Sequence, residues 1–216
     1  MAPAKSIARV DVAATKPAEP KVGEAAQAPP ALLLAEIERL KAEIARAELK
    51  ISELEARADT DPLLDVRNRR GFMRELKRSI AHLQRYKGEA VLLFIDLDGF
   101  KAVNDHHGHA AGDAVLKAVA HKLIGHVRAS DVVARLGGDE FCVLLWNLAA
   151  PHAEAKAREL ERVIEAVSVA YGETLVSVGA SAGVVPLSAE AVPEQVIHAA
   201  DQAMYARKTV RKRERR

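Results

Sequence analysis

The sequence predicts an α/β domain preceded by a long helix, and three patterns predict it. Apolar residues recur at heptad spacing through residues 31–60. An almost continuous apolar run at 90–97 has the composition of a strand that is buried on both faces. From residue 61 onward, stretches with helical periodicity alternate with short apolar strands, which is typical of a sheet covered by helices. The chain of 216 residues is long enough to form a real hydrophobic core.

Composition excludes several classes of protein. Lys and Arg number 32 against 30 Asp and Glu, and this near balance argues against bulk nucleic-acid binding, which needs a strong basic excess. A single cysteine, Cys142, excludes an intramolecular disulfide and a cysteine-rich zinc site, and it fits a reducing compartment. Uninterrupted apolar runs reach only about six residues, whereas a transmembrane helix needs ~20. We therefore expect a soluble, cytoplasmic protein with no transmembrane segment.

The first 60 residues divide into a leader and a helix. Residues 1–30 hold five of the nine prolines and bury too little apolar area to offset the entropy of ordering them, so we expect a disordered leader. In residues 31–60, one heptad series runs from Ile37 to Ala58 and a second from Leu33 to Leu54. Isoleucine at a and leucine at d favour a parallel two-stranded coiled coil, which would join two chains in a homodimer. The alternative is an amphipathic helix packed on its own domain.

Residues 61–216 are interpreted as one domain. Pro62 ends the first helix or starts a hinge. The patterns then predict a helix at 72–85, a strand at 90–97, a glycine-rich loop, a helix at 112–127, strands at 131–136 and 141–146, a helix at 151–169, a strand at 174–185 and a helix at 193–208. A four-residue connection that contains Gly137 and Gly138 joins the strands at 131–136 and 141–146, which is typical of a hairpin.

Acidic residues gather at the ends of two predicted strands. Asp96 and Asp98 lie two residues apart at the end of the buried strand, so alternation places both side chains on one face. Asp139 and Glu140 lie at the tip of the hairpin. If the two strands are neighbours, these carboxylates converge, and a hard cation such as Mg²⁺ with bound phosphate would relieve their repulsion. The alternative is that the four side chains are simply solvated.

These residues also resemble a known family. Leu136 to Phe141 read Leu-Gly-Gly-Asp-Glu-Phe, which is similar to the signature of the GGDEF family of diguanylate cyclases. Further motifs follow in the family's order along about 61–212 of the chain. They are Asp61–Leu63, Asn68–Phe72, Asp96–Asp105, Gly108-His109, Gly112-Asp113, Ser181–Gly183, Ala200–Tyr205 and Lys208. The resemblance implies a palm-like fold, in which helices flank a mainly antiparallel central sheet.

The same resemblance implies an activity. Each domain would be half an enzyme, and two domains of a homodimer, each holding one GTP, would form cyclic di-GMP and release two pyrophosphates. The implied cofactor is Mg²⁺, with Mn²⁺ as a substitute. Two other functions stay open: a non-catalytic cyclic di-GMP receptor that signals through the coiled coil, and a scaffold whose coiled coil recruits partners. Control by a regulatory protein bound to residues 1–60 also stays open. The intact signature favours the cyclase.

Individual roles are likewise implied by the resemblance. Asp96, Asp139 and the Leu97 carbonyl would bind the metal ion, with Asp139 as proton acceptor and Glu140 as the second catalytic carboxylate. Asn104 and Asp113 would recognise guanine, because an amide and a carboxylate complement its donor and acceptor edge. The expected phosphate contacts and surrounding backbone are Gly99, Phe100, Lys101, Gly137, Gly138, Lys208 and Lys212.

A second site and two departures complete the comparison with the family. Arg128 and Asp131 form an R-x-x-D stretch that resembles the family's inhibitory product site, with Arg135 nearby as a helper; the alternative is a surface ion pair. Leu64-Asp65 stands where the family usually has Thr-Gly. Arg211-Lys212-Arg213 stands where the family often has Gly-Arg-Asn, so we expect Arg211 or Lys212 to serve as a phosphate contact.

Overall fold

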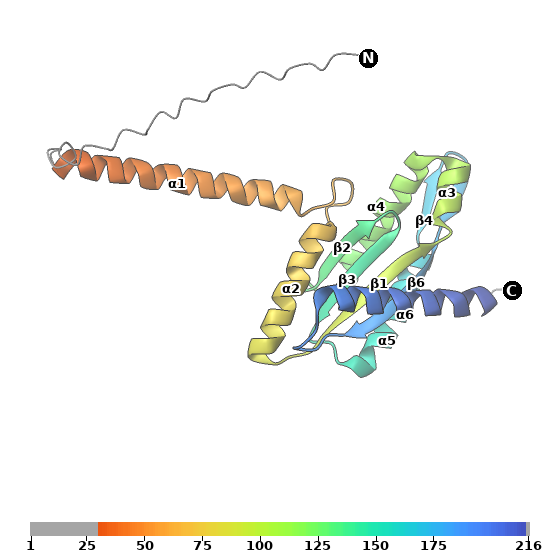
Figure 1. Cartoon of the computed structure of the whole chain (residues 1–216). Helices are drawn as coiled ribbons and strands as arrows, with labels where there is room; N and C mark the ends of the chain where they lie inside the picture. Colours follow the sequence, from red (N-terminus) through yellow and green to blue (C-terminus); the bar gives the residue numbers. More distant parts are fainter. Residues whose placement is uncertain (1–29, 215–216) are drawn as a thin grey trace, which may run out of the picture. The chain divides into compact units, whose positions relative to one another are not determined.

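The computed structural model describes residues 30–214, so the predicted leader lies outside the described residues apart from Pro30. Figure 1 labels the helices and strands. The helices are α1 (Pro30–Ala58), α2 (Arg69–Tyr86), α3 (Phe100–His107), α4 (His109–Gly125), α5 (Ala150–Glu165) and α6 (Pro193–Glu214). The strands are β1 (Ala90–Asp98), β2 (Val132–Gly137), β3 (Glu140–Trp146), β4 (Ser168–Tyr171), β5 (Thr174–Ser177) and β6 (Gly179–Pro186). Each described helix is too short or too polar to cross a lipid bilayer.

Helix α1 forms where the sequence predicts a helix before the domain. The side chains of its two heptad series are exposed along the helix. The exposed fraction is between 45% and 58% for Leu33, Ile37, Leu40, Ile44, Ile51 and Leu54. On the polar side, Arg39 forms ion pairs with Glu36 and Glu43. The apolar stripe is therefore available to pair with a second helix, and the coiled coil remains a prediction.

Four antiparallel strands form the main sheet in the order β2-β3-β1-β6. Strand β1 lies between β3 and β6, and its residues from Ala90 to Ile95 are all buried, which confirms the predicted buried strand. Strands β2 and β3 form the predicted hairpin, with a register irregularity between Arg135 and Gly137. The mainly antiparallel sheet of the predicted fold is thereby confirmed.

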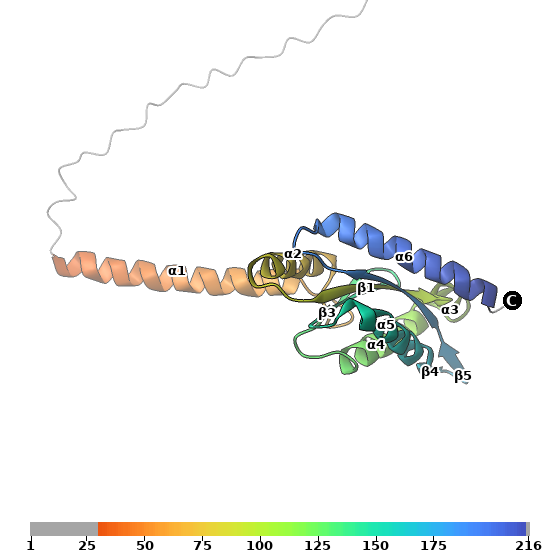
Figure 2. The same cartoon turned by 90° about the horizontal axis from the view of Figure 1, so that it is seen from below.

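Helices cover both faces of this sheet (Figure 2). Odd-numbered residues of β1 from Val91 to Leu97 pack with α4 and α5, and even-numbered residues from Ala90 to Phe94 pack with α2 and α6. Asp96 and Asp98 have the even parity, so they lie on the face that α6 covers. The alternation along one strand thus brings α6 to the acidic end of β1.

The predicted glycine-rich loop before residue 112 is wrong, because most of it is helical. Helix α3 ends at His107, Gly108 breaks the chain direction with a φ of 80°, and α4 begins at once. Gly112 lies inside α4, where a Cβ atom would collide with the side chain of Asn104. This glycine therefore reflects close packing between two helices instead of a loop.

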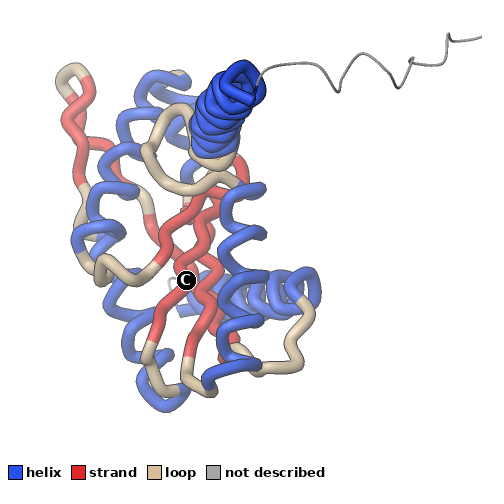
Figure 3. The backbone as a smooth tube through the Cα atoms, turned by 90° about the vertical axis from the view of Figure 1, so that its left-hand side faces the viewer, coloured by secondary structure: helices blue, strands red, loops and turns tan. Residues whose placement is uncertain are grey.

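The predicted helix at 151–169 and strand at 174–185 are also partly wrong. Helix α5 ends at Glu165, and the residues after it form β4, which pairs with β5 in a hairpin separate from the main sheet (Figure 3). Strand β6 begins only at Gly179. Most residues of β4 and β5 are exposed, so the hairpin leaves little apolar alternation in the sequence.

The segment that leads into the domain is held by side-chain hydrogen bonds. Asn68 caps α2 by accepting a hydrogen bond from the Gly71 amide over 2.9 Å, and its Nδ2 donates to the Ala58 and Thr60 carbonyls. Asp65, at the departure from the family's Thr-Gly, has a φ of 49°. Aspartate tolerates this left-handed conformation better than most residues, so Leu64-Asp65 can form a turn here although the family's glycine is absent.

Candidate functional site

The ends of β1 and β3 bring the four predicted carboxylates to one end of the sheet. Asp96 lies opposite Glu140 in the strand register, and the Leu97 amide donates to the Asp139 carbonyl oxygen over 3.2 Å. Gly138 has a φ of 45° in the turn that carries Asp139, a conformation that glycine adopts without strain. The two strands are neighbours, as the convergence of these carboxylates requires.

Lys208 of α6 lies over this acidic end. Its ammonium donates a hydrogen bond to Asp96 and lies 3.6 Å from Asp98 Oδ1, while Ser181 Oγ donates to Asp98 Oδ2 over 2.9 Å. Burial alone would lower the pKa of Lys208, but the hydrogen bond and charge of Asp96, with the charges of Asp98 and Asp139, raise the pKa overall. Lys208 is therefore a stable cation among the carboxylates.

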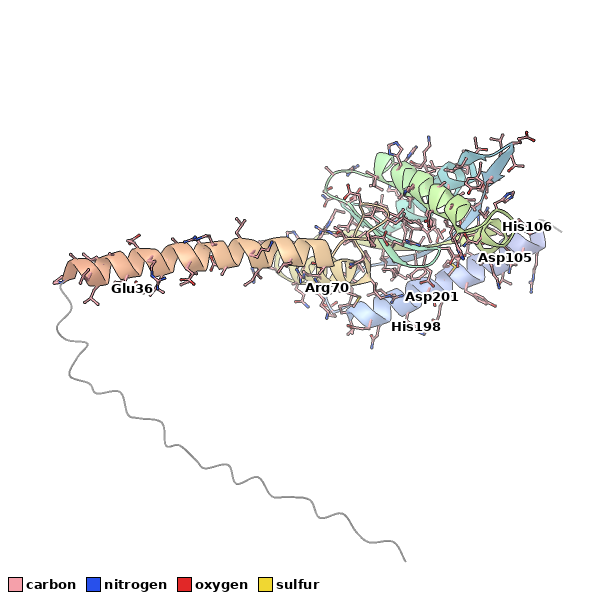
Figure 4. The ribbon with its side chains drawn as sticks, turned by 90° about the horizontal axis from the view of Figure 1, so that it is seen from above. Glu36, Arg70, Asp105, His106, His198 and Asp201 are labelled. Atoms are coloured by element: carbon pink, nitrogen blue, oxygen red, sulfur yellow. The ribbon has the colours of Figure 1, made fainter. Side chains whose placement is uncertain are left out.

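Negative charge nevertheless remains in excess at the turn. Burial, reinforced by the charge of Asp96, raises the pKa of the Asp139 carboxyl. Burial also raises the pKa of Glu140; the guanidinium of Arg69, 3.7 Å away, opposes the shift and the like charge of Asp201 adds to it. Figure 4 labels Asp201 on α6. Ionised carboxylates are thus disfavoured here, and a bound cation would stabilise them.

The donor set fits a magnesium ion. The Asp96 and Asp139 carboxylates and the Leu97 carbonyl are hard oxygen donors, which Mg²⁺ prefers. Within residues 30–214, no group of three His, Cys, Asp or Glu side chains is arranged to hold a metal by itself. Two carboxylates suit an ion that completes its coordination with water and phosphate oxygens, as Mg²⁺ does. These residues therefore fit an ion that binds together with a nucleotide.

A cavity of about 380 Å³ adjoins the acidic end and holds several of the predicted phosphate contacts. It is lined by Asp98, Gly99, Lys208, Arg211 and Lys212. Gly99 has a φ of 86° and precedes the first turn of α3, which carries the predicted contacts Phe100 and Lys101. Lysines from α6 and the amide end of α3 make this region favourable for a phosphate chain.

The two predicted guanine contacts lie on neighbouring helices. Asn104 is on α3, and its Oδ1 atom is buried with no hydrogen-bond partner. Asp113 is exposed on α4, one residue after Gly112, which packs against Asn104. An unsatisfied buried acceptor is costly, so an N–H group of a ligand would stabilise Asn104 in this position.

Arg128 and Asp131 line a larger cavity, of about 630 Å³. It lies between residues 127–133 on one side and residues 60–67 and α2 on the other. The Asp131 carboxylate accepts hydrogen bonds from the amides of Arg128, over 2.8 Å, and of Trp146, over 2.9 Å. The side chain of Arg128 is exposed. Asp131 thus stabilises the loop at 128–131, and Arg128 lines the cavity with an exposed side chain.

Two arginines hold the Gly-Gly turn in a way that the sequence analysis missed. Arg135, expected as a helper of the R-x-x-D stretch, donates from Nε and Nη2 to the Gly138 carbonyl over 3.0 and 2.9 Å and forms an ion pair with Asp61. Arg69 Nε donates to the Leu136 carbonyl over 3.2 Å. The only sequence signal was that Asp61 and Arg69 belong to segments shared with the family.

Comparison with known proteins identifies the family. The model of the GGDEF domain of diguanylate cyclases matches residues 58–214. The chain belongs to the GGDEF domain family. The match includes the acidic end of β1, the Gly-Gly turn and the whole of α6.

Relatives of this GGDEF protein include larger proteins. Diguanylate cyclase DgcP of Pseudomonas aeruginosa is 39% identical over 156 residues, which are 70% of this chain and 23% of DgcP. Diguanylate cyclase TpbB of the same species is 37% identical over 177 residues, which are 80% of this chain and 40% of TpbB. The chain therefore spans less than half the length of either relative.

Solved structures share the fold, and one of them includes a coiled coil. The coiled coil and GGDEF domain of DgcB from Caulobacter crescentus, in complex with c-di-GMP, has a TM-score of 0.70 at 27% identity, over 82% of this chain and 94% of that one. Diguanylate cyclase SiaD from Pseudomonas aeruginosa, in complex with its activator SiaC, has a TM-score of 0.68 at 29% identity, over 82% and 70% of the two chains.

Proposed function

We propose that this chain is a diguanylate cyclase, which condenses two GTP molecules into cyclic di-GMP and two pyrophosphates. The observation that carries the proposal is the meeting of Asp96, Asp139 and Lys208 beside the cavity of about 380 Å³, in a member of the GGDEF family. Loss of these side chains would favour a non-catalytic binding role, but all three are present in this chain.

The residues divide the work between binding and proton transfer. Asn104 and Asp113 bind guanine, and Lys208 and Lys212 bind phosphate oxygens. Asp139 accepts the proton of the 3′-hydroxyl that attacks the α-phosphate of the opposite GTP, and pyrophosphate leaves. Burial and the charge of Asp96 raise the pKa of the Asp139 carboxyl in the absence of a metal ion, and a bound cation would keep this carboxylate ionised and ready to accept a proton. A magnesium ion, when bound, would polarise the attacked phosphate and neutralise the leaving pyrophosphate.

The reaction requires two chains, because each GTP must meet a second one held in the opposite orientation. The exposed heptad stripe of α1 supports a homodimer as the active species. The arrangement of the two domains in that dimer depends on contacts between the two chains.

Purified protein incubated with GTP and Mg²⁺ tests the proposal directly. We expect cyclic di-GMP and pyrophosphate, identified by chromatography and mass, from the wild type and none above background from Asp139→Ala. A wild-type chain that is folded, cleared of bound nucleotide and still forms no product would refute the cyclase.

A second role, binding of the product at Arg128, is supported by the cavity of about 630 Å³ that this residue shares with Asp131. We expect Arg128→Ala to stay active while its affinity for cyclic di-GMP falls at least about tenfold, because a charged hydrogen bond contributes about 1.5–3 kcal/mol. Titration calorimetry and inhibition curves measure the two effects, with Arg85→Ala on exposed α2 surface as the control. If cyclic di-GMP inhibits Arg128→Ala as strongly as the wild type, the R-x-x-D stretch is not the inhibitory site.

A further inference from the structure

Four charged side chains of α5 and α6 form a partly buried group, here called the α6 anchor: Glu161, Glu165, Arg207 and Arg211. Arg211 Nη1 lies 3.1 Å from Glu161 Oε2, and Arg211 Nη2 donates to Glu165. Arg207 Nη2 also donates to Glu161, over 3.3 Å. The side chains of Arg211 and Glu161 are only 10% and 5% exposed. Two cations face two anions, so the charges of the group are balanced, including those of the buried pair Arg211 and Glu161.

The α6 anchor also binds the backbone of β6. Glu161 Oε1 accepts a hydrogen bond from the Ala182 amide over 2.9 Å, and Arg211 Nη1 donates to the Ala180 carbonyl. Ala180 and Ala182 flank Ser181, which lies opposite Asp96 in the register of β6 with β1. The anchor therefore ties α5 and the last turns of α6 to the strand segment beside the acidic end of β1.

Arg211 is three residues after Lys208 and one before Lys212, on neighbouring turns of α6. All three residues line the cavity of about 380 Å³, but their chemical states differ. Two nitrogens of the Arg211 guanidinium are engaged by glutamates and a carbonyl, so its charge is already compensated by the protein. Lys212 is exposed, and Lys208 reaches Asp96. Arg211 is thus suited to hold the helix that carries the two lysines and poorly suited to bind phosphate itself.

We propose that Arg211 is a positioning residue for the nucleotide phosphates: through the α6 anchor it fixes the last turns of α6 so that Lys208 and Lys212 face the phosphate cavity. A lysine on an unfixed helix end must lose backbone and side-chain entropy when it binds, and the anchor removes the backbone part of that cost beforehand. The inference rests on the proposed function for the identity of the ligand.

Binding of two guanine nucleotides with different phosphate chains tests the role. The probes are α,β-methylene-GTP, whose α–β bridge cannot be cleaved, and GMP, each with Mg²⁺ in titration calorimetry. We expect Arg211→Met to weaken the triphosphate analogue by about tenfold and GMP by less than about twofold, because only the end of the phosphate chain loses its contacts. Arg211→Lys, which keeps the charge and one donor group, should recover part of the loss.

Two further variants separate positioning from loss of charge or of fold. Arg213→Met removes the same charge from an exposed residue of α6 outside the anchor and should leave both affinities within about twofold of the wild type. Arg211→Met combined with Glu165→Gln restores the charge balance of the anchor. If circular dichroism and thermal unfolding show that the single variant is poorly folded, the two affinities are compared in this double variant instead.

The outcomes are distinct. If a folded Arg211→Met chain, or the folded double variant, binds the triphosphate analogue as tightly as the wild type, or if the analogue and GMP weaken equally, Arg211 has a merely structural role and the inference is overturned. If the wild type binds neither nucleotide, the proposed function itself fails, and the inference fails with it.

Discussion

Gly112 leaves no room for a side chain beside Asn104. A Cβ atom at position 112 would collide with Asn104 Oδ1 and lie 3.1 Å from the ring of Phe100. We expect Gly112→Ala to displace the Asn104 amide and to weaken binding of α,β-methylene-GTP by about fivefold, since one lost hydrogen bond corresponds to about 1 kcal/mol. An adenine analogue, which lacks guanine's N–H edge, should be affected less. Titration calorimetry measures both affinities.

Gly125 offers a matched control for this change. It ends the same helix, α4, and a Cβ atom there would meet nothing within 4 Å, so Gly125→Ala should leave both affinities unchanged. Equal weakening of the guanine and adenine analogues by Gly112→Ala would show that Asn104 does not read the base.

At the same scale, the sequence could predict which carboxylates meet but not which arginines support them. Alternation along β1 and a short hairpin suffice to bring Asp96 near Asp139. The ion pairs of Arg135 with Asp61 and of Arg211 with Glu165 depend on where long, flexible side chains end. Periodicity carries no information on that, because those partners are 46 residues away for Glu165 and 74 for Asp61.

Among the helices and strands, the predictable ones are those with a strong apolar pattern. The buried run of β1 and the amphipathic face of α2 could be assigned because burial dictates their residues. Helix α3 could not be assigned from the sequence because glycines flank it on both sides. The β4–β5 hairpin could not be assigned because few of its side chains are buried. In both cases tertiary contacts decide the local structure.

Helix α1 makes a prediction about association. Ile44 lies at an a position of the heptads and Leu49 at an f position, and their exposed fractions in the single chain are similar, 58% and 64%. Burying an isoleucine stabilises an interface by about 1.5–3 kcal/mol per side chain, and a dimer contains two. We therefore expect Ile44→Asp to weaken dimerisation about 100-fold or more, and activity per chain to fall at low protein concentration.

Leu49→Asp is the control, because it adds the same charge outside the heptad seam. Sedimentation equilibrium measures the dimer, and product formation over a range of protein concentrations measures its consequence. Equal effects of the two substitutions, or none, would contradict a coiled coil in this register.

For the whole molecule, residues 30–214 carry one set of the components of the proposed site: one acidic end, one pair of proposed guanine contacts and one proposed phosphate cavity. We propose that such a set holds one GTP, whereas the formation of cyclic di-GMP needs two GTP molecules that attack each other. The central claim is that the active site is complete only when two chains meet, each with its own Asp139.

The most direct test of that claim is product formation by mixed dimers. Wild-type and Asp139→Ala chains are coexpressed or exchanged at a fixed total concentration and in varied ratios, and cyclic di-GMP formed from GTP and Mg²⁺ is measured. We expect activity to fall as the square of the wild-type fraction, because only dimers with two intact halves close the ring. Activity that is proportional to the wild-type fraction, or absent from the pure wild type, would contradict the claim.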